Sequence, residues 1–191
     1  MLYTQLFEMA RSLSPITEKE WEDFSGSFTS GTAEKGELLQ RPGDEPKFIW
    51  VILSGIVRNY DLDDKGKEYT KVFRGPGELI GPYPELLAVT KTRFFIQSIT
   101  ESSFVRFPYS KFEEMMDKYK AWERLGRLLA QDNFLEKEKR EHDLMHLSAE
   151  QRYLEFTKQY GELAQSIPQY QIASSLAISP EALNRLIKAK K

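Results

Sequence analysis

Short hydrophobic runs separated by turn residues fill the chain between residues 36 and 107. The runs cover residues 48–53, 56–62, 68–73, 94–99 and 104–107. Turn sequences such as Pro42-Gly43-Asp44 and Gly75-Pro76-Gly77 separate them, and the pattern indicates no crossover helices between them. Strands joined without crossover helices pair in the antiparallel sense. This pattern therefore predicts an antiparallel β-roll.

Helical patterns flank this β-rich segment on both sides. Thr17-Glu18-Lys19-Glu20 and Ser110-Lys111-Phe112-Glu113 have the spacing of capping boxes, and so does Ser148-Ala149-Glu150-Gln151. The second box precedes a long helical run to about His146. We therefore predict an α+β fold with a β-roll domain at residues 1–110, a long connecting helix at 111–147 and a small helical domain at 148–191.

A narrow hydrophobic stripe runs along the predicted long helix, at Trp122, Leu125, Leu128, Leu129 and Leu135. A stripe of this width suits packing against one partner. That partner is either a second copy of the chain, which would make a homodimer, or the chain's own β-roll.

The absence of cysteine removes several classes of chemistry. It excludes disulfide bonds, a thiol nucleophile and the thiolate ligands of iron–sulfur clusters. The first residues lack the pattern of a secretory signal, and no hydrophobic stretch is long enough to span a membrane. We expect a cytoplasmic protein with no membrane partner.

Residues 172–187 read as two short helices joined by a tight turn. Ala173 is small enough to let two helices cross closely, Ser179 suits a helix N-cap, and Pro180 suits the first helical position. This arrangement is typical of a helix-turn-helix, whose second helix enters the major groove of DNA. The alternative is an ordinary helical hairpin with a solvated outer face.

The side chains on the outer face of the second helix suit base and phosphate recognition. Arg185 can donate two hydrogen bonds to guanine, Glu181 can accept one from cytosine, and Lys188 is placed for a phosphate. The net charge of the chain is −2 and its pI is about 5.9, so binding to double-stranded DNA would have to be local. Basic residues do gather at this end of the sequence. The predicted DNA-binding residues are Ser179, Pro180, Glu181, Asn184, Arg185 and Lys188, with Lys190 and Lys191 close behind.

Several of these sequences together resemble the Crp/Fnr superfamily of bacterial transcription regulators. The resemblance rests on Lys35-Gly36-Glu37-Leu38-Leu39, Ile52-Leu53-Ser54-Gly55, Gly75-Pro76-Gly77-Glu78-Leu79-Ile80-Gly81 and the Ser179-x-Glu181-x-x-x-Arg185 pattern. It implies a cupin-like β-roll of the cyclic-nucleotide-binding type, a homodimer, a small-molecule effector and RNA polymerase as a possible partner. Ala177 stands at a turn position where the family often has glycine.

The effector pocket departs from that family's cyclic-nucleotide pattern. The resemblance places the pocket at Gly81, Tyr83, Glu85, Arg93 and Phe95. Proline replaces the carboxylate that would bind the ribose, and bulky phenylalanines replace the small neighbours of the arginine. Prolines also remove backbone N–H donors that an anion needs. We therefore predict that the chain does not respond to cyclic AMP and binds a different small molecule, if any.

Catalytic and metal-binding patterns are weak. The sequence contains no phosphate loop and no nucleophile elbow, so we predict that the chain is not an enzyme and has no cofactor. His142 and His146 have a spacing compatible with a metal, but no third ligand is evident, and we predict no metal site. The leading hypothesis is a site-specific transcription regulator with a sensing β-roll. The alternative is a ligand-binding or protein-interaction module of the same fold that has lost DNA binding.

Overall fold

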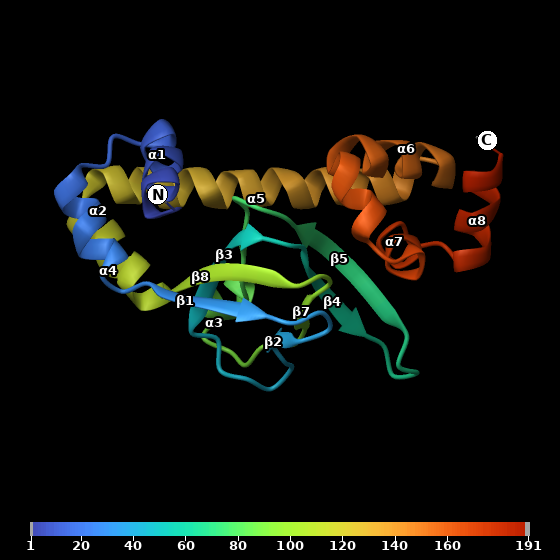
Figure 1. Cartoon of the computed structure of the whole chain (residues 1–191), viewed down its shortest axis with the longest axis horizontal. Coiled ribbons are helices and arrows are strands. Elements are labelled where there is room, and N and C mark those ends of the chain that lie inside the picture. The colour runs from blue at the N-terminus through green and yellow to red at the C-terminus, as the bar shows by residue number, and fades with distance from the viewer. Residues whose placement is uncertain (1, 190–191) are drawn as a thin grey trace.

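The computed structural model describes residues 2–189. One long helix runs along the molecule and the β-roll lies against its middle, with α3 on the side of the roll and the other helices at the two ends of the long one (Figure 1). The elements in chain order are α1 (Leu2–Leu13), α2 (Glu18–Ser25), β1 (Thr29–Ala33), β2 (Leu38–Gln40), β3 (Phe48–Ser54), β4 (Val57–Leu62), β5 (Glu68–Arg74), β6 (Leu79–Ile80), α3 (Tyr83–Ala88), β7 (Phe95–Ser98), β8 (Ser102–Pro108), α4 (Tyr109–Lys118), α5 (Lys120–His146), α6 (Ala149–Tyr160), the 3-10 helix η1 (Gly161–Ser166), α7 (Gln169–Ser175) and α8 (Pro180–Lys188).

The β-roll consists of two four-stranded sheets, and the predicted α+β fold is confirmed. The strand orders are β1-β8-β3-β6 and β2-β7-β4-β5, and every pairing is antiparallel. All five hydrophobic runs of the sequence form strands. Strands β1, β2 and β6 were not predicted, because β1 is mostly polar and the other two have only three and two residues.

Alternating side chains of the strands pack into two separate cores. One face packs inside the roll and joins both sheets through residues such as Trp50, Ile52 and Ile96. The opposite face of β3 contributes Ile49 and Val51 to a second core, which the helices α1, α2, α4 and the start of α5 cover. The sensor domain is therefore a roll with a helical layer on one sheet.

The predicted helix at 111–147 is in fact two helices, and its predicted capping box does not form. α4 begins at Tyr109, whose N–H donates to the Lys47 carbonyl at 2.9 Å, and no side chain caps it. Ser110 therefore lies inside the first turn. Tyr119 adopts an extended backbone conformation and separates α4 from α5. The two helices fold onto each other at Gly126, where a Cβ would come within 2.2 Å of the Met116 sulfur.

The two predicted partners of the hydrophobic stripe, the β-roll and a second copy of the chain, concern different parts of α5. Trp122 and Leu125 are buried in the core against the first sheet, so the first turns dock on the chain's own β-roll. Further along, Phe134 and Leu135 are about 60% exposed. Dimerisation through this second part stays a prediction.

The C-terminal helices share a core with the β-roll. Phe73 of the roll lies in one cluster with Phe156, Ile172 and Leu183 of α6, α7 and α8. The predicted capping boxes at Thr17 and Ser148 are both present, and the second one starts α6 as expected. The helical end is thus held against the sensor and is not an isolated satellite.

Candidate functional site

Helix α8 begins at the position that the sequence predicts. The hydroxyl of Ser179 accepts a hydrogen bond from the Ala182 N–H at 3.2 Å, and Pro180 occupies the first turn. The fully buried Leu183 anchors the inner side of α8 to the core beneath it. The start and the rotation of α8 are therefore both defined.

All six predicted DNA-contacting side chains are exposed on α8 or its N-cap. Glu181, Asn184, Arg185 and Lys188 are spaced three or four residues apart and so share one face of the helix. A hydrogen bond from the Ser179 hydroxyl is the main cause that lowers the pKa of Glu181, and its own backbone N–H adds to this. Glu181 is therefore a hydrogen-bond acceptor at neutral pH. Lys190 and Lys191 lie outside the described residues.

The turn between α7 and α8 contains a residue in the left-handed region. Ala177 has φ of 54°, which is a conformation that favours glycine. The turn is closed by two backbone hydrogen bonds, from the Ala177 N–H to the Ser174 carbonyl and from the Ile178 N–H to the Ala173 carbonyl. Ala173 is fully buried, as expected for a close helix crossing.

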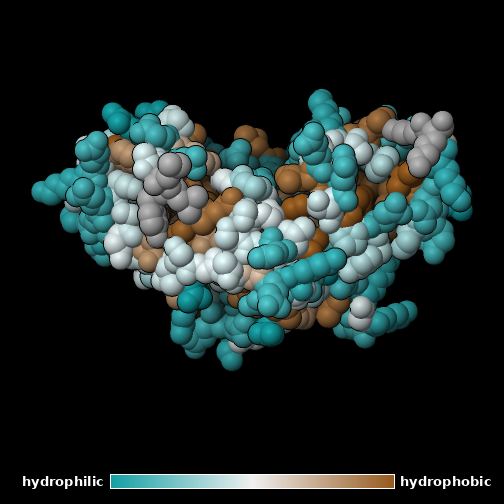
Figure 2. Space-filling view, viewed as in Figure 1, coloured by the Kyte–Doolittle hydropathy of each residue, from teal (hydrophilic) through white to brown (hydrophobic). Residues whose placement is uncertain are grey.

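A large groove of about 1510 Å³ lies between the β-roll and α5. Hydrophobic residues reach the surface in the hollow between the two ends of the molecule (Figure 2). Two of the predicted pocket residues, Gly81 and Tyr83, line this groove. Gly81 lies so close to strand β3 that a Cβ would come within 2.4 Å of Ile49.

The other three predicted pocket residues, Glu85, Arg93 and Phe95, do not line the groove. Glu85 is 1% exposed, and its Oε1 accepts a hydrogen bond from the Nε of Arg93 at 3.1 Å, while the Arg93 side chain is largely exposed. Phe95 stacks on Tyr60 at 4.9 Å, on the outer face of its sheet, because its neighbour Ile96 points into the roll. The five residues therefore do not form one pocket.

Three residues that were not predicted supply polar and aromatic groups to the groove. They are Asn59 of β4, Lys71 of β5 and Phe94 before β7. The Lys71 ammonium lies over the Phe94 ring at 5.2 Å, and the Asn59 side-chain oxygen is buried without a hydrogen-bond partner. The sequence could have indicated Asn59, because it is a polar residue at an inward-facing position of a hydrophobic strand. No sequence pattern indicated Lys71, because a register shift in the β4–β5 pairing places it.

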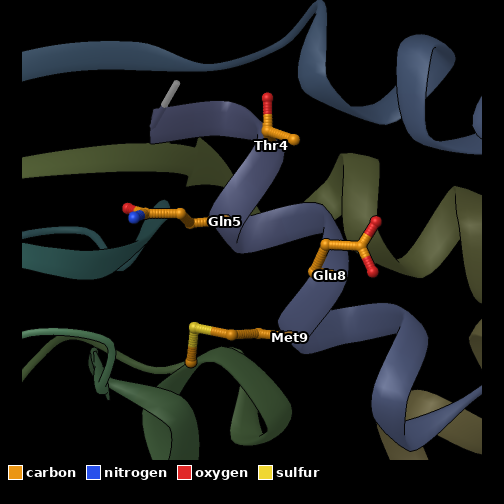
Figure 3. Close-up of a pocket in the computed structure, with 4 residues that line it drawn as sticks. All are labelled: Thr4, Gln5, Glu8 and Met9. Carbon is orange, nitrogen blue, oxygen red and sulfur yellow. The ribbon is translucent and has the colours of Figure 1, made fainter.

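A smaller hollow of about 470 Å³ lies beside α1, lined by Thr4, Gln5, Glu8 and Met9. Figure 3 shows Gln5 and Met9 extending to the same side of the helix, with Met9 reaching toward a neighbouring segment. Glu8 is the only charged group among the four. We assign no ligand to this hollow.

Within residues 2–189, no three His, Cys, Asp or Glu side chains come together in a way that could hold a metal ion. His142 and His146 stack with their ring centres 4.4 Å apart, and a backbone carbonyl contacts the second ring. None of the described helices is both long enough and apolar enough to cross a membrane.

Comparison with known proteins agrees with this architecture. Residues 32–119 match the family model of the cyclic nucleotide-binding domain. The transcriptional activator protein anr of Pseudomonas aeruginosa is 27% identical over 169 residues, which cover 80% of this chain and 66% of that protein. The regulatory protein HlyX of Actinobacillus pleuropneumoniae is 26% identical over 85 residues, and that match covers 44% of this chain and only 35% of HlyX.

The fold itself is shared with a solved structure. FixK2 from Bradyrhizobium japonicum aligns with a TM-score of 0.74 at 19% identity, over 85% of this chain and 83% of that one. At this identity the likeness concerns the fold alone. The chain thus contains a region that matches the cyclic nucleotide-binding domain, is similar in sequence to named bacterial regulators, and shares its fold with FixK2.

Proposed function

We propose that the chain is a site-specific DNA-binding transcription regulator whose helix α8 enters the major groove. The observation that carries the proposal is the exposed face of α8, where Glu181, Asn184 and Arg185 lie side by side. Bidentate donation by Arg185 would read guanine, the Glu181 carboxylate would read cytosine, and Asn184 suits adenine. The similarity to the transcriptional activator protein anr and to the regulatory protein HlyX supports the same role.

The regulator would act as a homodimer in the cytoplasm. The exposed hydrophobic residues Phe134, Leu135 and Met145 along α5 offer a surface for a second copy. Two copies would present two α8 helices to half-sites about 34 Å apart on a palindromic operator. RNA polymerase would then be a further partner at the promoter.

The groove between the β-roll and α5 is the proposed effector site. Its lining mixes hydrophobic walls with Asn59 and Lys71, which suits a small molecule with both apolar and polar groups. Cyclic AMP is not the expected ligand, because Glu85 and Arg93 are bonded to each other and Pro82 and Pro84 carry no N–H at the start of α3.

Genome-wide selection of DNA fragments by the purified protein at near-physiological salt tests this function. We expect the wild type to enrich a palindrome and Arg185→Ala to lose that enrichment. Lys19→Ala, which removes an exposed cation from α2 outside the groove, is the control and should behave like the wild type. Wild-type protein that enriches no sequence would contradict the proposal and favour an interaction module of the same fold.

A further inference from the structure

Strand β5 is the edge strand of its sheet, and its free edge is covered by another part of the chain. The strand order β2-β7-β4-β5 gives β5 a strand neighbour on one side only. The other side of an edge strand carries N–H and C=O groups that no strand pairs. In this molecule helix α7 lies beside that edge (Figure 1).

A single hydroxyl of α7 satisfies two of these backbone groups. The Ser174 Oγ accepts a hydrogen bond from the Thr70 N–H at 2.9 Å and donates one to the Glu68 carbonyl at 2.7 Å. The hydroxyl thus acts toward β5 as an adjacent strand would, with one acceptor and one donor. Serine and threonine are the side chains that offer both functions at one short-range atom.

Neighbouring side chains support this contact from α5 and α6. The Arg140 guanidinium donates to the Thr70 carbonyl at 3.0 Å. The Tyr160 hydroxyl lies 3.4 Å from the Phe73 nitrogen and 3.5 Å from its carbonyl oxygen, and its ring packs edge-on against the Phe73 ring. Burial raises the pKa of Tyr160, so its hydroxyl keeps the proton that it donates.

The same two residues of β5 also connect this edge to the neighbouring strand β4. The side chains of Glu68 and Thr70 accept hydrogen bonds from the buried guanidinium of Arg58 in β4, at 2.6 and 3.3 Å. The next residue of β4, Asn59, points to the groove. A short path therefore leads from the groove through β4 and β5 to α7.

The contact does not cover the face of α8 that would meet DNA. Glu181, Arg185 and Lys188 are exposed while Ser174 is bonded to β5. The contact consequently fixes where α8 stands relative to the sensor and leaves its reading face free.

We propose that Ser174 is a positioning residue, which fastens the helix-turn-helix to the edge of β5 and thereby sets the spacing between the two recognition helices of a dimer. This inference rests on the proposed function. Without the contact, α8 would keep its base-reading groups but would lose its fixed position. Binding of a dimer to its second half-site would then be weaker, because the released helix-turn-helix would have to be ordered again.

Hydrogen exchange of the full-length protein without DNA tests the contact itself. In Ser174→Ala we expect the Thr70 amide to exchange about tenfold faster, because one hydrogen bond of ordinary strength is lost. Ser174→Thr should restore wild-type exchange. Ser175→Ala is the matched control, since its hydroxyl bonds within α7 to the Ile172 carbonyl. Unchanged exchange of Thr70 in Ser174→Ala would overturn the inference.

Binding to duplexes with different half-site spacing tests the positioning role. We expect the wild type and Ser175→Ala to prefer the selected spacing over one lengthened by about two base pairs. In Ser174→Ala this preference should fall about tenfold, while affinity for a single half-site stays the same. Equal loss on the single half-site would mean that Ser174 serves stability or base contact and would overturn the proposal. If the wild-type protein selects no DNA sequence, both the proposed function and the spacing role are overturned. The hydrogen exchange of Thr70 is measured without DNA, so it tests the contact of Ser174 with β5 separately.

Discussion

The Nε of Arg93 donates a hydrogen bond to the Oε1 of Glu85 at 3.1 Å, and Glu85 is almost completely buried. The second oxygen of Glu85 has no hydrogen-bond partner among the described residues. A carboxylate and a guanidinium are the groups that a ribose and a cyclic phosphate would need. Here the carboxylate already partly neutralises the guanidinium, so an anionic ligand at this place would compete with Glu85 for the charge of Arg93.

We therefore predict that cyclic AMP does not raise the melting temperature of the protein. A ligand that binds the native state raises the stability by an amount that grows with its concentration relative to Kd. Thermal unfolding followed by fluorescence, with cyclic AMP titrated to millimolar levels, measures this directly. A concentration-dependent rise that Arg93→Ala abolishes would contradict the prediction and show that Arg93 binds the phosphate.

Replacement of the buried Arg58 should cost much of the stability of the β-roll. Its guanidinium bonds to Glu68, Thr70 and Gln97 and lies 3.9 Å over the Tyr60 ring, while the side chain is 1% exposed. Arg58→Met would remove the donor from the buried Thr70 hydroxyl and from the partly exposed Glu68 and Gln97. We expect the free energy of unfolding to fall by about 3 kcal/mol.

Urea unfolding of Arg58→Met measures that loss. Lys47→Ala is the control, because the ion pair of Lys47 with Glu45 is exposed on both sides and should contribute less than about 0.5 kcal/mol. A loss of about 1 kcal/mol or less in Arg58→Met would indicate that water or the neighbouring side chains replace the guanidinium.

The sequence predicted those elements that depend only on residues close together in the chain. The short hydrophobic runs between turn residues predicted five strands of the roll, and the caps at Thr17, Ser148 and Ser179 formed as expected. Ser110 failed as a cap because the backbone of Tyr109 already bonds to Lys47, which is distant in sequence. Spacing alone could not reveal that competition.

The features that depend on tertiary contact could not be predicted. The break at Tyr119 lets α5 fold back on α4, where Gly126 packs closely against Met116. Phe95 was assigned to the pocket by its place in the sequence, but the alternation of β7 turns it to the outer face of the sheet. The contact of Ser174 with β5 joins residues about a hundred positions apart. The outward face of α8, in contrast, followed from helical spacing and one buried leucine.

The positive φ of Ala177 predicts a stabilising substitution. Glycine adopts this conformation without the penalty that a Cβ brings. Relief of the strain at Ala177 should raise the free energy of unfolding of Ala177→Gly by up to about 1 kcal/mol. The larger entropy of glycine in the unfolded chain offsets part of this gain. Ala182→Gly in the first turn of α8 is the matched control and should destabilise by up to about 1 kcal/mol. The same sign for both variants in thermal unfolding would contradict the assigned turn.

Lys188 and Arg185 share the exposed face of α8 but should differ in how they act on DNA. Lys188 near the C-terminal end of the helix is placed for a phosphate, so Lys188→Ala should weaken binding to every duplex by a similar factor and reduce the slope of log affinity against log salt by about 1. Arg185→Ala should instead cost about 1–3 kcal/mol on the selected sequence and relax the preference at one base pair. Fluorescence anisotropy over a salt series, with selected and scrambled duplexes, separates these two effects. If Lys188→Ala affected only the selected duplex, Lys188 would be a base reader, and the recognition surface would extend further along α8 than the first two turns.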